Sequence, residues 1–193
     1  FEPIGTSDNL WLVAALYDAQ DEVGRINLRL DPGLAFGTGS HPTTRVCLQW
    51  LASEMPEKLK GSTVLDYGCG SGILAIAAKK LGAGVVMGTD IDPQAVQSAV
   101  DNAVANDTEA TFVLPDGMVD GATYDVVVAN ILSNPLKLLA SALVSRVGQG
   151  GHLVLSGILE RQTDELIEAY APYMKMALWR ADDGWIALVG QKV

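Results

Sequence analysis

The chain has 193 residues, 49% of them hydrophobic and 19% charged, a balance typical of a folded α/β protein and unlike that of a disordered or fibrous chain. Its formal net charge of −10 disfavours nonspecific attraction to a nucleic-acid backbone and suits a basic protein partner. The two cysteines, Cys47 and Cys69, have the spacing of neither a zinc site nor a disulfide framework, so we expect no metal.

The first 40 residues are punctuated by glycine and proline. Their two apolar runs, 10–16 and 26–30, are interpreted as strands. The chain starts at Phe1 with a linker-like Phe-Glu-Pro sequence, from which we infer a fragment of a longer protein. We therefore expect a linker and lead-in segment over residues 1–40 and one catalytic-sized domain over residues 41–193.

Beyond residue 41 the apolar periodicity alternates between that of a helix and that of a strand. Helices are predicted over residues 42–55, 72–81, 94–106, 134–147 and 159–171. Strands are predicted over residues 63–67, 85–90, 111–114, 124–129 and 152–156. Continuous apolar strands that alternate with helices require a mostly parallel, doubly wound sheet with helices on both faces.

The end of the chain departs from this alternation. Segments 174–179 and 184–191 read as two strands joined by residues 180–184, which is a hairpin signal. A hairpin introduces an antiparallel strand, whereas a dinucleotide dehydrogenase would normally continue with parallel crossovers. The tail therefore favours the methyltransferase variant of the α/β fold.

Three glycines, Gly68, Gly70 and Gly72, separate the strand at 63–67 from the following helix. Glycine permits close approach of a ligand, and the loop N–H groups at a helix N-terminus face it. Ile73 occupies the position where a dinucleotide fingerprint needs its third glycine. Asp66 at the strand end can accept hydrogen bonds from a ligand, and an acidic residue there suits a sulfonium amino acid better than a pyrophosphate.

Asp90 ends the second strand, about 20 residues beyond the glycine loop, where a carboxylate can accept hydrogen bonds from both ribose hydroxyls of an adenosine. Asp92 lies close by, but it directly precedes Pro93 and is equally well explained as a helix N-cap. We therefore rank Asp90 first as the ribose ligand.

A hydroxyl-rich loop with two glycines precedes the helix predicted at 42–55. Phe36, Gly37 and Thr38 in this loop are candidates to close over a cofactor, and the alternative is helix capping by Ser40 or Thr43. Capping explains one or two residues but not Phe36 between small residues. His41 receives no role.

Asn130 appears where the apolar strand 124–129 emerges at the catalytic edge of such sheets. Its amide oxygen can accept a hydrogen from an incoming amine and aim the nitrogen lone pair. The alternative is a turn-forming asparagine, and the position relative to the glycine loop favours the functional role. Asp116 lies where an adenine edge is expected, but Pro115-Asp116-Gly117 is also an ordinary turn, and the two readings have equal weight.

Four stretches together resemble one family, the PrmA-like ribosomal protein methyltransferases that modify large-subunit protein eleven. The resemblance runs from about residue 25 to the end and includes the sequence Leu-Ser-Gly-Ile-Leu at 155–159. Residues 31–44 are its most specific motif, and the glycine loop at residues 66–72 is shared by many methyltransferases. The four stretches are residues 31–44, 66–72, 88–93 and 128–132.

The resemblance implies a Rossmann-like class I S-adenosylmethionine-dependent fold with a seven-stranded sheet. It implies S-adenosylmethionine held by Thr44, Gly68, Asp90 and Asn130, and transfer of its methyl group to lysine side-chain and N-terminal amines of a large-subunit ribosomal protein. The family also has an N-terminal substrate-recognition domain, which we expect this chain to lack.

Other functions are less well supported by the sequence. The acidic balance and the lack of a basic patch count against an RNA substrate, so we expect no direct nucleic-acid binding, while a small-molecule substrate stays open. A nicotinamide oxidoreductase is disfavoured by Ile73 and the terminal hairpin, and a noncatalytic cofactor-binding module remains possible. No apolar run reaches bilayer length and no signal pattern opens the chain, so we expect a cytoplasmic protein without membrane contact.

Overall fold

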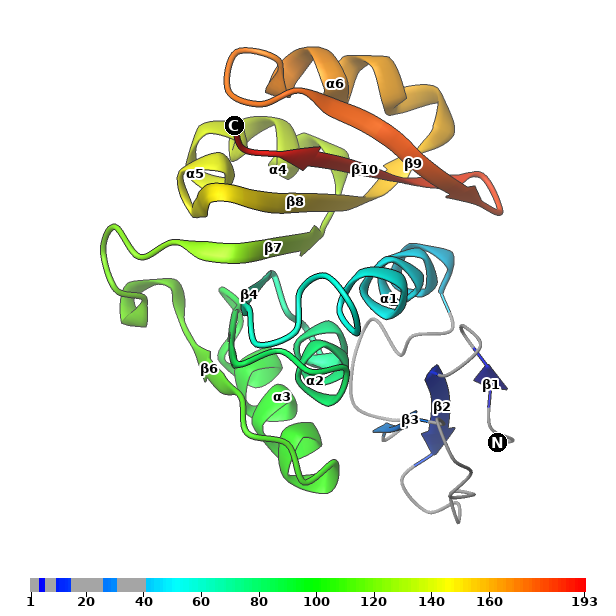
Figure 1. The fold of residues 1–193 in the computed structure, drawn as a ribbon, viewed down its shortest axis with the longest axis vertical. Helices are drawn as coiled ribbons and strands as arrows, with labels where there is room; N and C mark the ends of the chain where they lie inside the picture. The colour runs from blue at the N-terminus through cyan, green and yellow to red at the C-terminus, as the bar shows by residue number, and fades with distance from the viewer. Residues whose placement is uncertain (1–3, 6–9, 15–25, 31–40) are drawn as a thin grey trace.

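A computed structural model describes residues 4–5, 10–14, 26–30 and 41–193 of the chain. Its largest sheet has seven strands in the order β6-β5-β4-β7-β8-β10-β9 (Figure 1). Neighbouring strands are parallel except at β10, which runs antiparallel to both β8 and β9. The strands are β4 Thr63–Tyr67, β5 Val85–Thr89, β6 Thr111–Val113, β7 Tyr124–Asn130, β8 Val147–Leu159, β9 Met176–Asp182 and β10 Trp185–Gln191. The predicted mostly parallel sheet with a terminal hairpin is confirmed.

Helices cover both faces of this sheet, as a doubly wound fold requires. Alternate residues of the strands supply the two cores: Val64 and Val128 face a cluster with α1, α2 and α3, while Leu65 and Val127 face a cluster with α4, α5 and α6. The helices are α1 Pro42–Glu54, α2 Ile73–Lys80, α3 Pro93–Ala105, α4 Ser133–Leu138, α5 Ala140–Ser145 and α6 Thr163–Tyr170.

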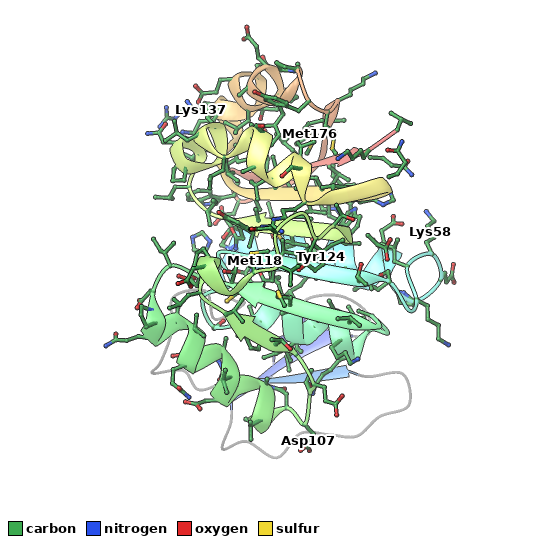
Figure 2. The ribbon with its side chains drawn as sticks, turned by 90° about the vertical axis from the view of Figure 1, so that its left-hand side faces the viewer. Lys58, Asp107, Met118, Tyr124, Lys137 and Met176 are labelled. Atoms are coloured by element: carbon green, nitrogen blue, oxygen red, sulfur yellow. The ribbon has the colours of Figure 1, made fainter. Side chains whose placement is uncertain are left out.

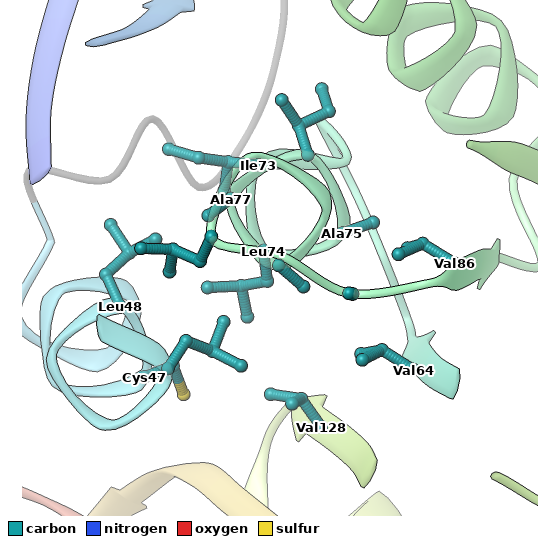
Figure 3. Close-up of a cluster of buried hydrophobic side chains, with 14 of the residues drawn as sticks. Cys47, Leu48, Val64, Ile73, Leu74, Ala75, Ala77, Val86 and Val128 are labelled. Atoms are coloured by element: carbon teal, nitrogen blue, oxygen red, sulfur yellow. The ribbon is translucent and has the colours of Figure 1, made fainter. Parts of the chain in front are cut away.

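The first cluster is centred on α2, whose short side chains let the helix approach the strands closely. Figure 3 shows Leu74 of α2 between Cys47 of α1 and Val64 of β4. The second cluster contains Met118, Tyr124 and Met176, which Figure 2 labels. Each cluster covers one face of the sheet. The loops at the carboxyl ends of the parallel strands contain several of the candidate site residues.

Three short strands precede α1 in the chain and form a second sheet in the order β1-β2-β3 (Figure 1). They are β1 Ile4–Gly5, β2 Leu10–Ala14 and β3 Ile26–Leu30. The predicted strands near residues 10 and 26 are confirmed. Leu28 of β3 is fully buried in the first cluster, so β3 shares the core of the larger sheet.

Three predicted elements between residues 134 and 171 differ from the structure. The helix predicted over 134–147 is two helices, because Leu139, with φ −94° and ψ 7°, departs from helical geometry between α4 and α5. The strand predicted over 152–156 is longer at both ends: Val147 pairs with Tyr124, and Leu159 pairs with Trp185. The following helix accordingly begins only at Thr163, after a 3₁₀ turn, η2 Glu160–Gln162.

The terminal hairpin turns more tightly than predicted. β9 continues to Asp182, and only Asp183 and Gly184 separate it from β10. Both residues have positive φ, 51° and 80°, as a two-residue hairpin of right-handed twist requires. β10 thereby lies between β8 and β9 rather than at the edge of the sheet. None of the helices in the described part of the chain is long and apolar enough to cross a bilayer.

Candidate active site at the carboxyl edge of the sheet

Parallel register brings the ends of four strands to one edge. Tyr67 of β4 lies beside Thr89 of β5 and Ala129 of β7, and Thr89 lies beside Val113 of β6. The loops after these strands carry four of the predicted site regions. Crevices outside the carboxyl ends of strands are where open α/β sheets bind ligands.

The glycine turn follows β4 and is fixed by backbone hydrogen bonds to β5. Gly68, Gly70 and Gly72 have φ values of 72°, 50° and 78°, which side chains rarely adopt. The N–H groups of Gly68 and Cys69 both donate to the carbonyl of Thr89, at 2.8 and 2.9 Å. The turn is therefore held to β5 through its backbone.

Asp90 meets this turn directly. The Gly70 N–H donates to its Oδ2 at 3.0 Å, and the Asp92 N–H donates to its Oδ1 at 3.0 Å. Each carboxylate oxygen can accept a second hydrogen bond, so the group is oriented yet still able to accept from ligand hydroxyls. The two regions predicted to hold a cofactor, the glycine turn and Asp90, thus lie together.

Asp92 caps α3. Its carboxylate accepts a hydrogen bond from the Gln94 N–H at 2.9 Å, in an extended conformation typical of an N-cap. The capping interpretation of Asp92 is confirmed.

Asp66 differs from Asp90 in its surroundings, since only 2% of it is exposed. Its Oδ2 accepts from the Ala75 N–H at 3.1 Å, in the first turn of α2, where the N-cap Gly72 has no side chain to do so. Burial, with a smaller contribution from the nearby Asp90 carboxylate, raises the pKa of Asp66 from 3.8 to about 8. Asp66 thus joins the end of β4 to the first turn of α2, and its contact with a cofactor stays a prediction.

One residue that supports the glycine turn was not identified from the sequence. Asn102 of α3 is 5% exposed and donates from Nδ2 to the Ser71 carbonyl at 2.9 Å. The sequence did contain a signal, an asparagine at a buried helical position between Ala99 and Ala103. A buried amide group needs a hydrogen-bond partner.

Asn130 ends β7 and contacts α1. Its Nδ2 lies 3.2 Å from Oγ1 of Thr44, a residue 86 positions away and only 2% exposed. The structure therefore brings together Asn130 of β7 and Thr44 of α1, both of which the resemblance assigns to the cofactor. When Nδ2 donates to Thr44, the amide oxygen of Asn130 remains an acceptor for a ligand.

The N-terminus of α1 is arranged differently from the prediction. Its N-cap is His41, not Ser40 or Thr43: His41 Nδ1 accepts from the Thr43 N–H at 3.2 Å. The His41 ring packs edge-on against Trp185 of β10, with centroids 5.3 Å apart. The predicted cofactor loop with Phe36, Gly37 and Thr38 lies outside the described residues.

α1 is also tied to the hairpin by an ion pair. Arg45 donates from Nε and Nη2 to the two carboxylate oxygens of Asp182, at 2.7 and 2.8 Å. The pair raises the pKa of Arg45 and lowers that of Asp182. The ion pair thus fixes α1, the helix that carries Thr44, to β9 at the edge of the sheet.

Asp116 lies in a 3₁₀ turn, η1 Pro115–Gly117, directly after β6, and is exposed. This places it at the same edge of the sheet as Asp90, whose N–H donates to the Val113 carbonyl at 3.4 Å. The turn interpretation of Pro115-Asp116-Gly117 is confirmed, and adenine contact stays a prediction. Within the described residues, no group of three potential metal-binding side chains is found.

A sequence profile of the ribosomal protein L11 methyltransferase (PrmA) family matches residues 1–193. Ribosomal protein L11 methyltransferases of Cupriavidus metallidurans and Bordetella parapertussis are 58% and 56% identical to the chain and are matched along its whole length. The chain spans 62% and 64% of these two relatives.

Solved structures agree with this relationship. A ribosomal protein L11 methylase from Lactobacillus delbrueckii subsp. bulgaricus superposes with a TM-score of 0.86 at 35% identity, covering 100% of both chains. The 16S rRNA N2 G1207 methyltransferase RsmC of T. thermophilus, solved with AdoMet and guanosine, shares the fold at a TM-score of 0.70 and 21% identity, over 82% of this chain and 45% of its own. The chain therefore belongs to the PrmA family of ribosomal protein L11 methyltransferases and has the class I methyltransferase fold.

Proposed function

We propose that the protein transfers methyl groups from S-adenosylmethionine to lysine side-chain and N-terminal amines of ribosomal protein L11, in the cytoplasm. The observation that carries this proposal is the meeting of the glycine turn, Asp90 and the Asn130–Thr44 pair at one edge of the sheet. The names of relatives up to 58% identical support the substrate.

The residues at this edge fit the proposed cofactor. Glycines with positive φ provide a turn whose backbone a ligand can approach closely. Asp90 would accept from the ribose hydroxyls, and Thr44 and Asn130 would contact the same ligand from α1 and β7. Asp66 adds a buried carboxyl that would contact the same ligand through hydrogen bonds rather than through charge, because its pKa of about 8 leaves it largely protonated near pH 7.

When bound, S-adenosylmethionine supplies a methyl group on a sulfonium that is already activated for displacement. The chain's own part is to bind, orient and exclude water. The amide oxygen of Asn130 would accept a hydrogen from the incoming amine and aim its lone pair. A lysine amine with a pKa near 10.4 must first lose its proton.

We further propose that residues 41–193 form the methyltransferase domain, preceded by a linker and lead-in segment over residues 1–40. In the relatives, about a third of the length lies outside the matched region and would supply substrate recognition. The negative charge of the chain suits a basic ribosomal protein better than bare RNA.

A labelled-methyl transfer assay tests this function. The full-length gene product is incubated with S-adenosylmethionine carrying a labelled methyl group and with purified ribosomal protein L11, and labelled positions are located by mass spectrometry. We expect label on lysine and N-terminal amines. Label found only on ribosomal RNA or on small molecules, with L11 unmodified, would overturn the proposal.

A further inference from the structure

Ile131, the residue directly after Asn130, lies against the glycine turn. A Cβ built on Gly68 would be 2.5 Å from Cγ2 of Ile131, closer than real carbon atoms approach. The methyl group therefore occupies the place beside Gly68 that a side chain would otherwise take. Ile131 itself is half-buried and packs against the second hydrophobic cluster.

The backbone of Ile131 lies against a second glycine, on β8. A Cβ built on Gly157 would overlap the Ile131 carbonyl oxygen, and would be 2.7 Å from the carbonyl carbon and 3.2 Å from the Ile131 nitrogen. Gly157 also has a φ of 88°, which favours glycine. The chain thus leaves β7 through a space that only a glycine at position 157 keeps open.

These two contacts fix Ile131 from opposite sides. Gly157 is a neighbour in space because Asn130 pairs with Ser156 in the register between β7 and β8. Gly68 is a neighbour because Tyr67 pairs with Ala129 between β4 and β7. Ile131 therefore connects the turn proposed to hold the cofactor with the strand end that carries Asn130.

We propose that Ile131 is a positioning residue that sets the separation between the cofactor-holding glycine turn and the acceptor-aligning Asn130. This inference rests on the proposed function. Methyl transfer is sensitive to this separation, because displacement of reacting groups by about 1 Å can cost roughly 100-fold in rate. Ile131 itself need not touch the substrate or the cofactor.

The chemistry of the side chain explains why an isoleucine serves here. Cγ2 is bonded directly to Cβ, so its position follows from the backbone and one stiff torsion angle. Leucine has the same number of atoms but carries its branch one carbon farther out. Valine is smaller yet keeps both groups on Cβ, and it therefore serves as the matched control.

The test compares Ile131→Leu with Ile131→Val in the full-length gene product, measuring kcat for L11 methylation, the Kd for S-adenosylmethionine by calorimetry, and Tm. We expect Ile131→Leu to lower kcat about tenfold or more while Kd changes less than about threefold, because the ligand contacts remain and the alignment is lost. Ile131→Val should keep kcat within about threefold of the parent.

Two results would overturn the inference. Equal kcat values for both variants and the parent would show that the branch at Cβ does not set the separation. A parallel loss of kcat, cofactor affinity and Tm in Ile131→Leu, with Ile131→Val unaffected, would show that Ile131 supports only the fold. Failure of the proposed function is distinguishable, because the parent protein itself would then leave L11 unmethylated.

Discussion

The two halves of the candidate site are held in place by different kinds of contact. The glycine turn is fixed to β5 mainly through backbone N–H groups, and its bond from Gly70 to Asp90 joins residues 20 positions apart. Asn130 is fixed by side-chain contacts with residues distant in sequence, since its partner Thr44 is 86 positions away. The first half depends on backbone conformation and the second on tertiary packing.

This difference predicts that the two halves fail in different ways. Changes around Asp90 should weaken cofactor binding, because the carboxylate is both a ligand and an acceptor from Gly70. Changes around Asn130 should leave the cofactor bound but misaligned with the acceptor. Separate measurements of cofactor binding and of turnover can therefore confirm or contradict this division of roles between Asp90 and Asn130.

The largest effect is expected from Asp90→Ala. The variant removes the proposed acceptor of the ribose hydroxyls and leaves the Gly70 and Asp92 N–H groups without their partner. Because hydrogen bonds to a charged group contribute about 1.5–3 kcal/mol each, we expect a loss of cofactor affinity on the order of 100-fold. Isothermal titration calorimetry with S-adenosylmethionine measures it.

Asp92→Ala is the matched control for Asp90→Ala. It removes the N-cap of α3, which costs about 1 kcal/mol of stability, while the Asp92 N–H that supports Asp90 remains. Cofactor affinity should stay close to that of the parent. Similar affinity losses in both variants would remove Asp90 from the proposed binding site.

Asn130→Ala should act mainly on turnover. We expect kcat for L11 methylation to fall about 10- to 100-fold, since the amide that aims the amine is lost, with a smaller change in cofactor Kd. Asn134→Ala, at an exposed position of α4, is the control. Unchanged kcat in a steady-state assay would contradict the role of Asn130.

A third prediction concerns the pH dependence of stability. The folded-state pKa of Asp66 is about 8 against 3.8 for an ordinary carboxyl, so the folded protein holds a proton that the unfolded chain releases between these pH values. The contribution of Asp66 to stability therefore falls as pH rises from about 4 to 8.

Asp66→Asn should remove this dependence, because the amide is neutral and its oxygen can still accept from Ala75. Without cofactor, we expect the Tm advantage of the variant over the parent to be larger at pH 9 than at pH 5 by at least about 3 °C, the shift that 1 kcal/mol gives a chain of this size. Thermal unfolding at both pH values tests this. A Tm advantage at pH 9 no larger than that at pH 5 would contradict it.

The smallest effect is expected for the Arg45–Asp182 pair, which is partly exposed, with 31% and 20% of the side chains accessible. A double-mutant cycle with Arg45→Ala and Asp182→Ala should give a coupling of about 1 kcal/mol at pH 7. The pair lowers the pKa of Asp182, so the coupling should persist above the ordinary carboxyl pKa and vanish as pH falls through the lowered value. Urea unfolding of the four proteins at a series of pH values from 7 downward measures both, and a coupling that grows as pH falls would be the contrary result.

The half of the site built on backbone conformation could be predicted from the sequence. Gly68, Gly70 and Gly72 are needed because the turn requires positive φ at each, and Asp90 follows at the spacing that one helix and one strand impose. These are local properties of short segments. Asp92 was likewise identifiable as a cap, because it directly precedes a proline at a helix start.

The other half could not be predicted in this way. The fit of Ile131 onto Gly157 depends on the register between β7 and β8. The helix break at Leu139, whose side chain packs against the second cluster, has no glycine or proline at that position to signal it. Thr44 was identified only through family resemblance, whereas Asn130 was identified from its position at the end of an apolar strand. The contact between them exists because α1 packs against the end of β7. Long-range packing of this kind leaves no periodic pattern in the chain.

The position of β10 constrains the order in which the sheet can be completed. Its neighbours β8 and β9 both come earlier in the chain, so neither acquires this partner until residues 185–191 have been synthesised. A nascent chain that stops before Trp185 would expose two unpaired strand edges, which are sites of aggregation. β10 thus closes the half of the sheet beside β8 only after both of its neighbours have been synthesised.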